Sequence, residues 1–159
     1  MNLFVLLSCC YNNPMNLTKH PLTRDDENLI RKIHHAAYHD VIVEQFGSWD
    51  EKVQDVFFGK SWKPETHEMI LENNVPVGYV WIEHNKDHIF IHELVISPEF
   101  QGKGIGSQIL KETIDEAKAK NIPVRLQVLK KNKAQNLYRR FGFKDTGTTD
   151  THFEMELIP

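Results

Sequence analysis

The sequence predicts a single α/β domain built on a mixed sheet. Its 159 residues suit one domain with a substantial core. Helix-like and strand-like apolar spacings alternate along the chain, and a glycine-rich turn at 102–106 joins a strand pattern to a helix pattern. The expected order is two helices, three strands, a helix, a strand, a helix and two strands. Helices thus alternate with strands along the chain, as is typical of a mixed α/β sheet.

The first helix is expected to begin after Thr23, which can cap it, while the acids at 25–27 suit the positive end of the helix dipole. Its apolar residues recur at helical spacing: Leu29, Ile30, Ile33, Ala36 and Ala37. A loop over residues 39–49 and a short second helix from about Asp50 follow, and Trp62–Pro64 ends that helix. The second helix is expected to face inward with Val53, Val56 and Phe57.

Three strands are expected next. Thr66–Leu71 and Val75–Glu83 are predicted to form a hairpin about a turn at Asn73–Asn74, because apolar residues alternate in the second segment. His88–Ile96 is apolar on both faces near its end, which favours a central strand.

The rest of the chain alternates helix and strand. A helix from about Gly104 to Lys120 is expected to bury one apolar stripe: Ile105, Ile109, Leu110, Ile114 and Ala117. The remaining segments are a strand at 124–129, a helix at 133–141 and a final hairpin at 143–149 and 152–157.

The composition argues against several classes of partner. The net charge of −3, from 19 basic and 22 acidic residues, gives no general attraction to nucleic acid or to an anionic membrane. The two cysteines, Cys9 and Cys10, are adjacent and cannot build a disulfide framework. The cysteine-free remainder fits a reducing, cytoplasmic location. We therefore expect neither nucleic acid nor a membrane as partner.

Residues 1–14 are interpreted as an N-terminal extension and residues 15–159 as the domain. Leu3–Leu7 is apolar, and Leu6–Cys9 resembles a lipoprotein cleavage site, which leaves export open as an alternative. No Lys or Arg precedes the apolar run, however, and the run is short for a signal sequence and far too short to span a bilayer. Met15 is an alternative start, because ordinary polar–apolar alternation begins there.

The turn Gln101–Gly106 follows a strand and opens a helix, an arrangement that binds phosphate. Backbone N–H groups and the helix dipole favour an anion there, and glycine lets the anion approach. A P-loop is excluded because Ser97 occupies the place of its first glycine. A dinucleotide-binding turn is disfavoured because Ser107 occupies the place of its third glycine.

The same six residues match in full the pattern Gln/Arg-x-x-Gly-x-Gly/Ala. Together with the segments ELVISPEFQGKGIG and NKAQNLYRRFGF, they make the sequence similar to the GNAT superfamily of acyl-CoA N-acyltransferases. One departure is that the small residue which the family has three positions after Asn132 is here Gln135, with Ala134 one place earlier. The resemblance implies one GNAT-like domain with a mixed, mostly antiparallel sheet flanked by helices.

The resemblance also implies a site for acetyl-CoA as the acyl donor. The amides of the glycine turn would hold the pyrophosphate, and the end of the third strand would separate from its neighbour and pair with pantetheine. The residues so implied are Leu94, Val95, Ile96, Gln101, Gly102, Lys103, Gly104, Ile105, Gly106, Ser107, Asn132 and Tyr138.

Acetyl transfer to an amine needs a proton acceptor, because alkylamines are protonated at neutral pH, and it benefits from a proton donor to the departing thiolate. The resemblance implies that Tyr138 faces the CoA sulfur, where its phenol can donate. A packing role for Tyr138 on the apolar stripe of its helix is the alternative. The backbone N–H of Leu94 is the candidate donor to the oxyanion.

Two neighbours, His92 and Glu93, are candidate bases, and water without a dedicated base is a third possibility. On a regular strand their side chains take opposite faces, His92 with Phe90 and Glu93 with Ile91, although a bulge would reverse this parity. Several branches of the resembled family carry a His or an acid at the position of His92, facing the acceptor, and His92 is therefore preferred.

Other polar residues give weaker signals. His35 and His39 lie one helical turn apart beside His34, but no third ligand is evident and no metal site is expected. The resemblance implies that the loop over residues 39–49 borders the acceptor pocket, where Asp40 and Glu44 could attract a cationic amine; solvated acids are the alternative.

The sequence thus predicts an acetyl-CoA-dependent N-acetyltransferase that acts by direct transfer in a ternary complex. The acceptor is expected to be an amine on a small molecule, or on a protein N-terminus or lysine. The alternative is a non-catalytic acyl-CoA-binding module that kept the cofactor cleft. A small mixed sheet with an exposed edge is compatible with a monomer or a homodimer.

Overall fold

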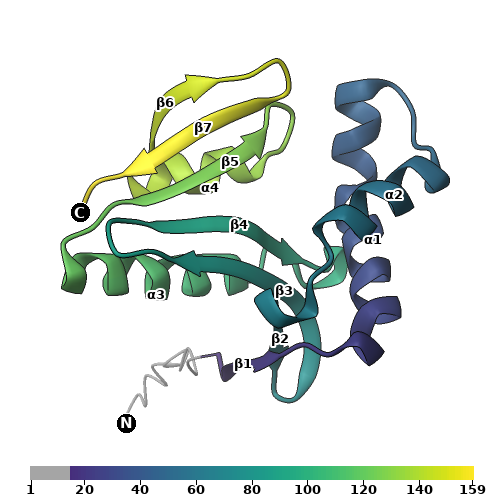
Figure 1. Ribbon diagram of the computed structural model, residues 1–159, viewed down its shortest axis with the longest axis horizontal. Helices are drawn as coiled ribbons and strands as arrows, with labels where there is room; N and C mark the ends of the chain where they lie inside the picture. Colours follow the sequence, from purple (N-terminus) through teal and green to yellow (C-terminus); the bar gives the residue numbers. More distant parts are fainter. Residues whose placement is uncertain (1–14) are drawn as a thin grey trace, which may run out of the picture.

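A computed structural model describes residues 15–159, so the predictions for residues 1–14 lie outside the described residues (Figure 1). In the described chain, seven strands form one sheet in the order β1-β2-β3-β4-β5-β7-β6. Neighbouring strands are antiparallel, except that β4 and β5 are parallel. The predicted fold class, a mixed and mostly antiparallel sheet flanked by helices, is confirmed.

The elements are β1 (Leu17–Pro21), α1 (Glu27–Phe46), α2 (Glu51–Ser61), β2 (Glu68–Glu72), β3 (Val75–His84), β4 (Ile89–Ile96), α3 (Ile105–Lys120), β5 (Val124–Leu129), α4 (Ala134–Phe141), β6 (Lys144–Thr148) and β7 (His152–Leu157). Short 3-10 turns at 24–26, 64–66 and 98–100 precede α1, β2 and the glycine turn. Sequence reasoning did not assign β1 as a strand, because four of its five side chains are exposed and the polar–apolar alternation from Met15 is short. β2 begins two residues later than predicted, after the turn at 64–66.

α1 begins as the sequence predicts but ends later. Thr23 and Asp26 form a capping box, in which the backbone N–H of Thr23 donates to the Asp26 carboxylate at 2.8 Å. The helix then continues to Phe46 and ends at Gly47, whose φ is +89°. The predicted loop over residues 39–49 is therefore mostly helix, because no glycine or proline interrupts the chain before Gly47.

α2 buries a different face from the one predicted. Asp50 caps it as expected, accepting the backbone N–H of Val53 at 3.0 Å. Gln54 and Phe58 are buried, and Phe58 packs with Ile30 of α1. Three apolar residues that were predicted to face inward are exposed: Val53, Val56 and Phe57.

Two helical layers cover the sheet (Figure 1). α1 and α2 pack on one face through a core that includes Ile30, Phe58 and Tyr79. α3 and α4 pack on the other face, where Leu110 and Tyr138 join a second core. β4 lies at the centre of the sheet, as the sequence predicts.

The parallel strands β4 and β5 separate toward their carboxyl ends. Their register pairs Ile89–Ile91 with Val124–Leu126 and ends there. Beyond these pairs β4 continues beside β3 and β5 continues beside β7. The sheet therefore opens into a wedge at the ends of two parallel strands, where ligands commonly bind in α/β folds.

A β-bulge interrupts β4 at His92. Trp81 and Ile82 are adjacent in β3 but pair with Glu93 and Ile91, so His92 has no partner in the register. A bulge reverses the alternation of side chains that follow it. His92 and Glu93 consequently line the same pocket, and the regular-strand expectation that they take opposite faces is wrong.

Candidate active site

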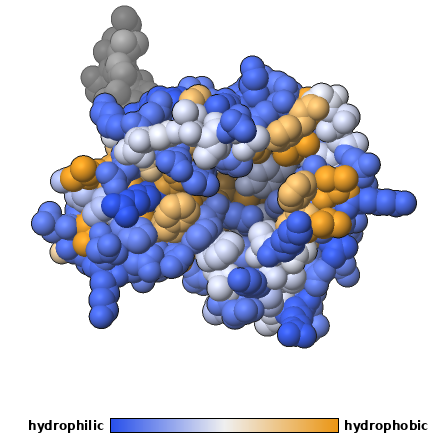
Figure 2. All heavy atoms as spheres, turned by 45° about the horizontal axis from the view of Figure 1, so that its top comes forward, coloured by the Kyte–Doolittle hydropathy of each residue, from blue (hydrophilic) through white to orange (hydrophobic). Residues whose placement is uncertain are grey.

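A cleft of about 620 Å³ follows the wedge from the glycine turn to α4. It is lined by all but one of the residues implied for acetyl-CoA: Leu94, Val95, Ile96, Gln101, Gly102, Gly104, Ile105, Gly106, Ser107, Asn132 and Tyr138. The exception, Lys103, places its ammonium nitrogen 4.9 Å from the centre of the Phe100 ring. Figure 2 shows a face of the molecule with a hollow near its centre, where apolar side chains lie among hydrophilic ones.

The glycine turn has a backbone that requires glycine. Gly102 and Gly104 have φ of +73° and +90°, in the left-handed region that other residues rarely adopt. The Gln101 amide donates to the carbonyl oxygen of Ile96 at 2.9 Å, which ties the turn to the end of β4. The first turn of α3 lines the cleft and contains no acidic residue, so its free N–H groups suit an anion.

Basic side chains complement this anion site. Lys131, Lys133 and Arg140 line the same cleft, from the loop before α4 and from α4 itself. CoA carries a pyrophosphate and a further phosphate, so these cations and the α3 N-terminus match its charge. Leu137 adds apolar surface of the kind that suits pantetheine. The residues present therefore fit acetyl-CoA.

Tyr138 lies on α4 in the wall of the cleft. Its side chain is buried, and burial raises the pKa of Tyr138 to about 12. The phenol therefore stays protonated at neutral pH, as a proton donor must. Its ring also packs on Phe143, with 5.8 Å between centroids, so packing and a place at the cleft are compatible.

A second pocket, of about 240 Å³, adjoins the cleft, and the two share Tyr38 and Asn132. It is lined by Tyr38, Phe90, His92, Glu93, Gln127, Leu129, Asn132 and His152. Asp40 and Glu44, the acids considered for the acceptor, lie on α1 and line the larger cleft. The smaller pocket combines both candidate bases with aromatic and amide groups.

His92 is held by contacts on β3. Its Nε2 lies 2.7 Å from a carboxylate oxygen of Glu83, and its ring stacks on Trp81 with 4.0 Å between centroids. The hydrogen bond from His92 lowers the pKa of the Glu83 carboxyl. One ring nitrogen of His92 is thus already engaged with an acid.

Glu93 is less exposed, and it lies against a buried histidine. Its side chain is 14% exposed, and one carboxylate oxygen lies 3.4 Å from Nε2 of His67. Burial raises the pKa of Tyr38, and the charge of Glu93 raises it further. Tyr38 lines both pockets, the smaller one together with Glu93 and the larger one together with Tyr138.

Sequence reasoning did not find Tyr38, His67 or His152. Tyr38 stands four residues after the buried His34, and that spacing on the inward stripe was the available signal. His152 bonds Thr151 Oγ1 through Nδ1 at 2.7 Å, and burial lowers the pKa of its imidazole. No local pattern marks His67 or His152, because long-range sheet pairing brings them to the site.

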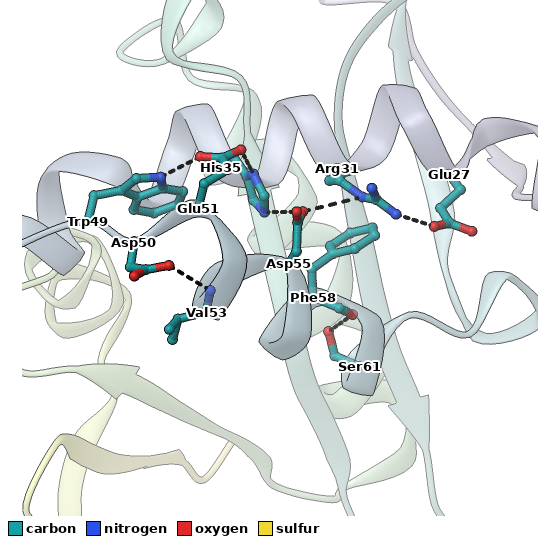
Figure 3. Close-up of polar contacts among 10 residues, drawn as sticks. All are labelled: Glu27, Arg31, His35, Trp49, Asp50, Glu51, Val53, Asp55, Phe58 and Ser61. Atoms are coloured by element: carbon teal, nitrogen blue, oxygen red, sulfur yellow. Dashed lines mark hydrogen bonds and ion pairs between the residues drawn. The ribbon is translucent and has the colours of Figure 1, made fainter.

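The histidines of α1 take different places. His35 Nδ1 lies 3.0 Å from Glu51 and its Nε2 lies 3.7 Å from Asp55, and both acids belong to α2. Figure 3 shows these contacts joining α1 to α2. His39 lies beside Asp40 and does not join this cluster, and burial lowers the pKa of His34 to about 4.

Known proteins share this fold and these motifs. A model of the acetyltransferase (GNAT) family matches residues 31–143. The thialysine N-epsilon-acetyltransferase of Sus scrofa is 29% identical over 140 residues, which cover 76% of this chain and 79% of that protein. The [ribosomal protein bS18]-alanine N-acetyltransferase of Haemophilus influenzae is 27% identical over 85 residues, covering 53% and 58%.

Among solved structures, the PaiA N-acetyltransferase from Thermoplasma acidophilum, in complex with coenzyme A, superposes with a TM-score of 0.74 at 18% identity. The match covers 91% of this chain and 100% of that one. The ribosomal-protein-S18-alanine N-acetyltransferase from Escherichia coli gives a TM-score of 0.62 at 19% identity, covering 89% and 93%. These structures have the same fold as this chain.

The chain belongs to the GNAT acetyltransferase family. It is an N-acetyltransferase that uses acetyl-CoA as donor and an amine as acceptor, as the sequence predicts. The comparisons give no support to a non-catalytic module. Within residues 15–159, no helix combines the length and the hydropathy needed to cross a membrane.

Gly106→Val is expected to weaken acetyl-CoA binding by roughly tenfold or more. A Cβ at Gly106 would lie 3.7 Å from Leu137 and 4.0 Å from Ile96, so the branched side chain narrows the cleft without straining the backbone. A tenfold loss of affinity removes about 1.4 kcal/mol of the stabilisation by ligand, which is measured as a smaller rise in Tm. Gly59→Val on the open face of α2 is the control, and an unchanged rise in Gly106→Val would contradict this placement of the donor.

Proposed function

We propose that the acceptor amine enters the smaller pocket and meets the acetyl thioester where that pocket joins the cleft. One observation carries the proposal: Glu93 lines the smaller pocket, Tyr138 lines the cleft, and Tyr38 lines both, so the two spaces meet between a carboxylate and a phenol. Direct transfer in a ternary complex requires a proton acceptor and a proton donor on the two sides of one reacting centre. This arrangement supports Glu93 as the proton acceptor and Tyr138 as the proton donor.

Each group then has one task. The Glu93 carboxylate takes a proton from the bound ammonium, directly or through water, so that the amine can attack the acetyl carbon. The backbone N–H of Leu94, at the separated end of β4, donates to the oxygen on which negative charge develops. The Tyr138 phenol donates to the sulfur as it leaves, and the second proton that the nitrogen loses as the amide forms restores the phenol. Gln101–Gly106 and the start of α3 hold the pyrophosphate and fix the position of the donor.

Glu93, rather than His92, is proposed as the base, which revises the preference drawn from the sequence. His92 is bound by Glu83 and stacked on Trp81, and both of these residues belong to β3. Glu93 is close enough to Tyr38 for its charge to raise the pKa of that phenol. His92 then lines the route of the amine or of a bridging water.

The proposed acceptor is a primary alkylamine on a small molecule. A pocket of about 240 Å³ fits an amine side chain better than a folded protein segment, and the Glu93 carboxylate favours a cation there. The Sus scrofa relative is named for thialysine, a small amino acid, and the Haemophilus influenzae relative for a ribosomal protein. A protein N-terminus or lysine is the second candidate, which the second relative favours.

Four further features are proposals. Residues 15–159 form the catalytic domain, the enzyme works in the cytoplasm, it is a monomer or homodimer, and neither nucleic acid nor a membrane is its partner. The cysteine-free sequence after residue 10 supports the location, and the net charge supports the statement on partners.

A mass-spectrometric screen of amines with acetyl-CoA is expected to find acetylated products among small primary alkylamines. The panel pairs lysine and thialysine with short peptides that present a free N-terminal alanine or only a side-chain lysine. Acetylation of the peptides alone would replace the small-molecule proposal with a protein acceptor. CoA release without any acetylated product would contradict the amine acceptor itself.

Tyr138→Phe is expected to lower kcat at least about tenfold and to leave KM for acetyl-CoA within about twofold. The change keeps the ring and its packing on Phe143 and removes only the proton donor. Because burial raises the pKa of Tyr138 to about 12, the phenol should add no titration to the wild-type profile below about pH 10. A kcat equal to that of the wild type would reduce Tyr138 to a packing residue.

Glu93→Gln and His92→Gln separate the two candidate bases. We expect Glu93→Gln to lower kcat about 10²-fold near pH 7, with the loss shrinking at high pH as free amine becomes abundant. His92→Gln should change kcat by less than about threefold, because it keeps a polar side chain at the mouth of the pocket. The pH–rate profiles of both variants, on one acceptor, provide the measurement. The reverse order of effects would make His92 the base.

A further inference from the structure

His67 lies behind Glu93, between the turn at 64–66 and β2. Its side chain is only 1% exposed. Nδ1 lies 2.8 Å from the carbonyl oxygen of Lys63 and 3.0 Å from Oγ1 of Thr66. The Thr66 hydroxyl itself donates to the same Lys63 carbonyl, at 2.9 Å. Since a carbonyl oxygen only accepts hydrogen bonds, Nδ1 of His67 carries a proton.

The proton on Nδ1 decides what faces Glu93. The other ring nitrogen, Nε2, lies 3.4 Å from the Glu93 carboxylate. If His67 were neutral, Nε2 would turn a lone pair toward that carboxylate, and two buried acceptors would face each other without a proton. An imidazolium removes this conflict, because its second N–H points to the carboxylate and the two charges compensate.

We propose that His67 is a positioning residue, whose imidazolium holds the Glu93 carboxylate ionised and turned toward the acceptor pocket. This inference rests on the proposed role of Glu93 as the base. His67 does not reach the substrates, because it is buried and lies outside both pocket linings. It acts through Glu93.

The rings around His67 favour a cation. The centres of Trp62, Tyr79 and Trp81 lie 5.6, 5.8 and 5.1 Å from the centre of its ring. The electron-rich faces of aromatic rings attract cations within about 6 Å, most strongly where water is excluded. Burial opposes a charged histidine, but the aromatic rings and Glu93 together offset that cost.

Three other titratable groups near Glu93 are neutral at pH 7, and His92, which lines the same pocket, is already paired with Glu83. Burial lowers the pKa of His34 on α1 to about 4, so it is neutral at pH 7. Burial raises the pKa values of Tyr38 on α1 and Tyr79 on β3, and the charge of Glu93 raises both further. Both phenols are therefore neutral as well. Apart from His92, His67 alone of these neighbours can carry a positive charge at pH 7.

The consequence concerns the pH at which the base is available. An opposite charge within about 4–6 Å favours the ionised carboxylate, and removing that charge favours the neutral acid by roughly 1–3 pH units. A protonated Glu93 cannot take the proton of the amine. Loss of the His67 charge should therefore shift the acidic limb of the pH–rate profile to higher pH.

The test compares His67→Phe, which keeps a ring of similar size but removes both nitrogens, with His67→Gln, which keeps a neutral donor. We expect His67→Phe to move the acidic limb of kcat up by about one pH unit or more, with KM for acetyl-CoA within about twofold. Compared with His67→Phe, His67→Gln should recover part of kcat at high pH, because its amide can still orient Glu93. It should not return the acidic limb to the pH at which the wild type has it. A lowered Tm with an unmoved acidic limb in both variants would show a purely structural role and overturn the proposal.

A second measurement does not depend on the activity of Glu93. ¹⁵N NMR of the His67 ring in the wild type at pH 7 should show protons on both nitrogens. In Glu93→Gln it should show a neutral ring protonated at Nδ1 alone. A neutral His67 in the wild type would overturn the proposal even if Glu93 is the base. If Glu93→Gln keeps full activity while His67 is an imidazolium in the wild type, only the role of Glu93 fails.

Discussion

The separation of β4 from β5 is the constraint on which the site depends. The two strands share three residue pairs, Ile89–Ile91 with Val124–Leu126, and then diverge. Where the two strands diverge, the backbone N–H and C=O groups on their facing edges no longer pair with each other. A ligand with amide groups can form hydrogen bonds with such an edge. Both pockets open at this wedge, the larger toward the glycine turn and the smaller toward β7. Closing the sheet would remove both.

The β-bulge at His92 is the second structural feature on which the site depends, and it lies on β4, one of the two strands that separate. One extra residue in β4 brings His92 and Glu93 to a single pocket, where a regular strand would have separated them. It also sets Glu93 against the turn that carries His67. Glu93 thus contacts a buried histidine on the protein side and lines the pocket on the other.

Local signals in the sequence predicted most of the fold, and the residues that they single out for the donor lie along one cleft. Gln101–Gly106 and Tyr138 belong to motifs that are contiguous in sequence. All of these residues except Lys103 line one cleft. Features that depend on non-local packing were not predictable. The buried face of α2 is chosen by α1, and the bulge is defined only by pairing with β3. His67 lies close to Glu93 because β2 and β4 flank β3 in the sheet. No periodic pattern in the sequence indicates that the two residues are neighbours.

The most direct test of the account is a crystal structure of the enzyme bound to a CoA–amine conjugate, in which the amine is joined to the CoA sulfur through an acetyl bridge. The account predicts that the pyrophosphate contacts the amides of Gly102–Gly106 and that the sulfur lies within hydrogen-bond reach of the Tyr138 hydroxyl. The amine nitrogen should lie in the smaller pocket, beside the Glu93 carboxylate or one water away. A conjugate whose sulfur lies outside the β4–β5 wedge, or whose amine leaves through the larger cleft, would contradict it.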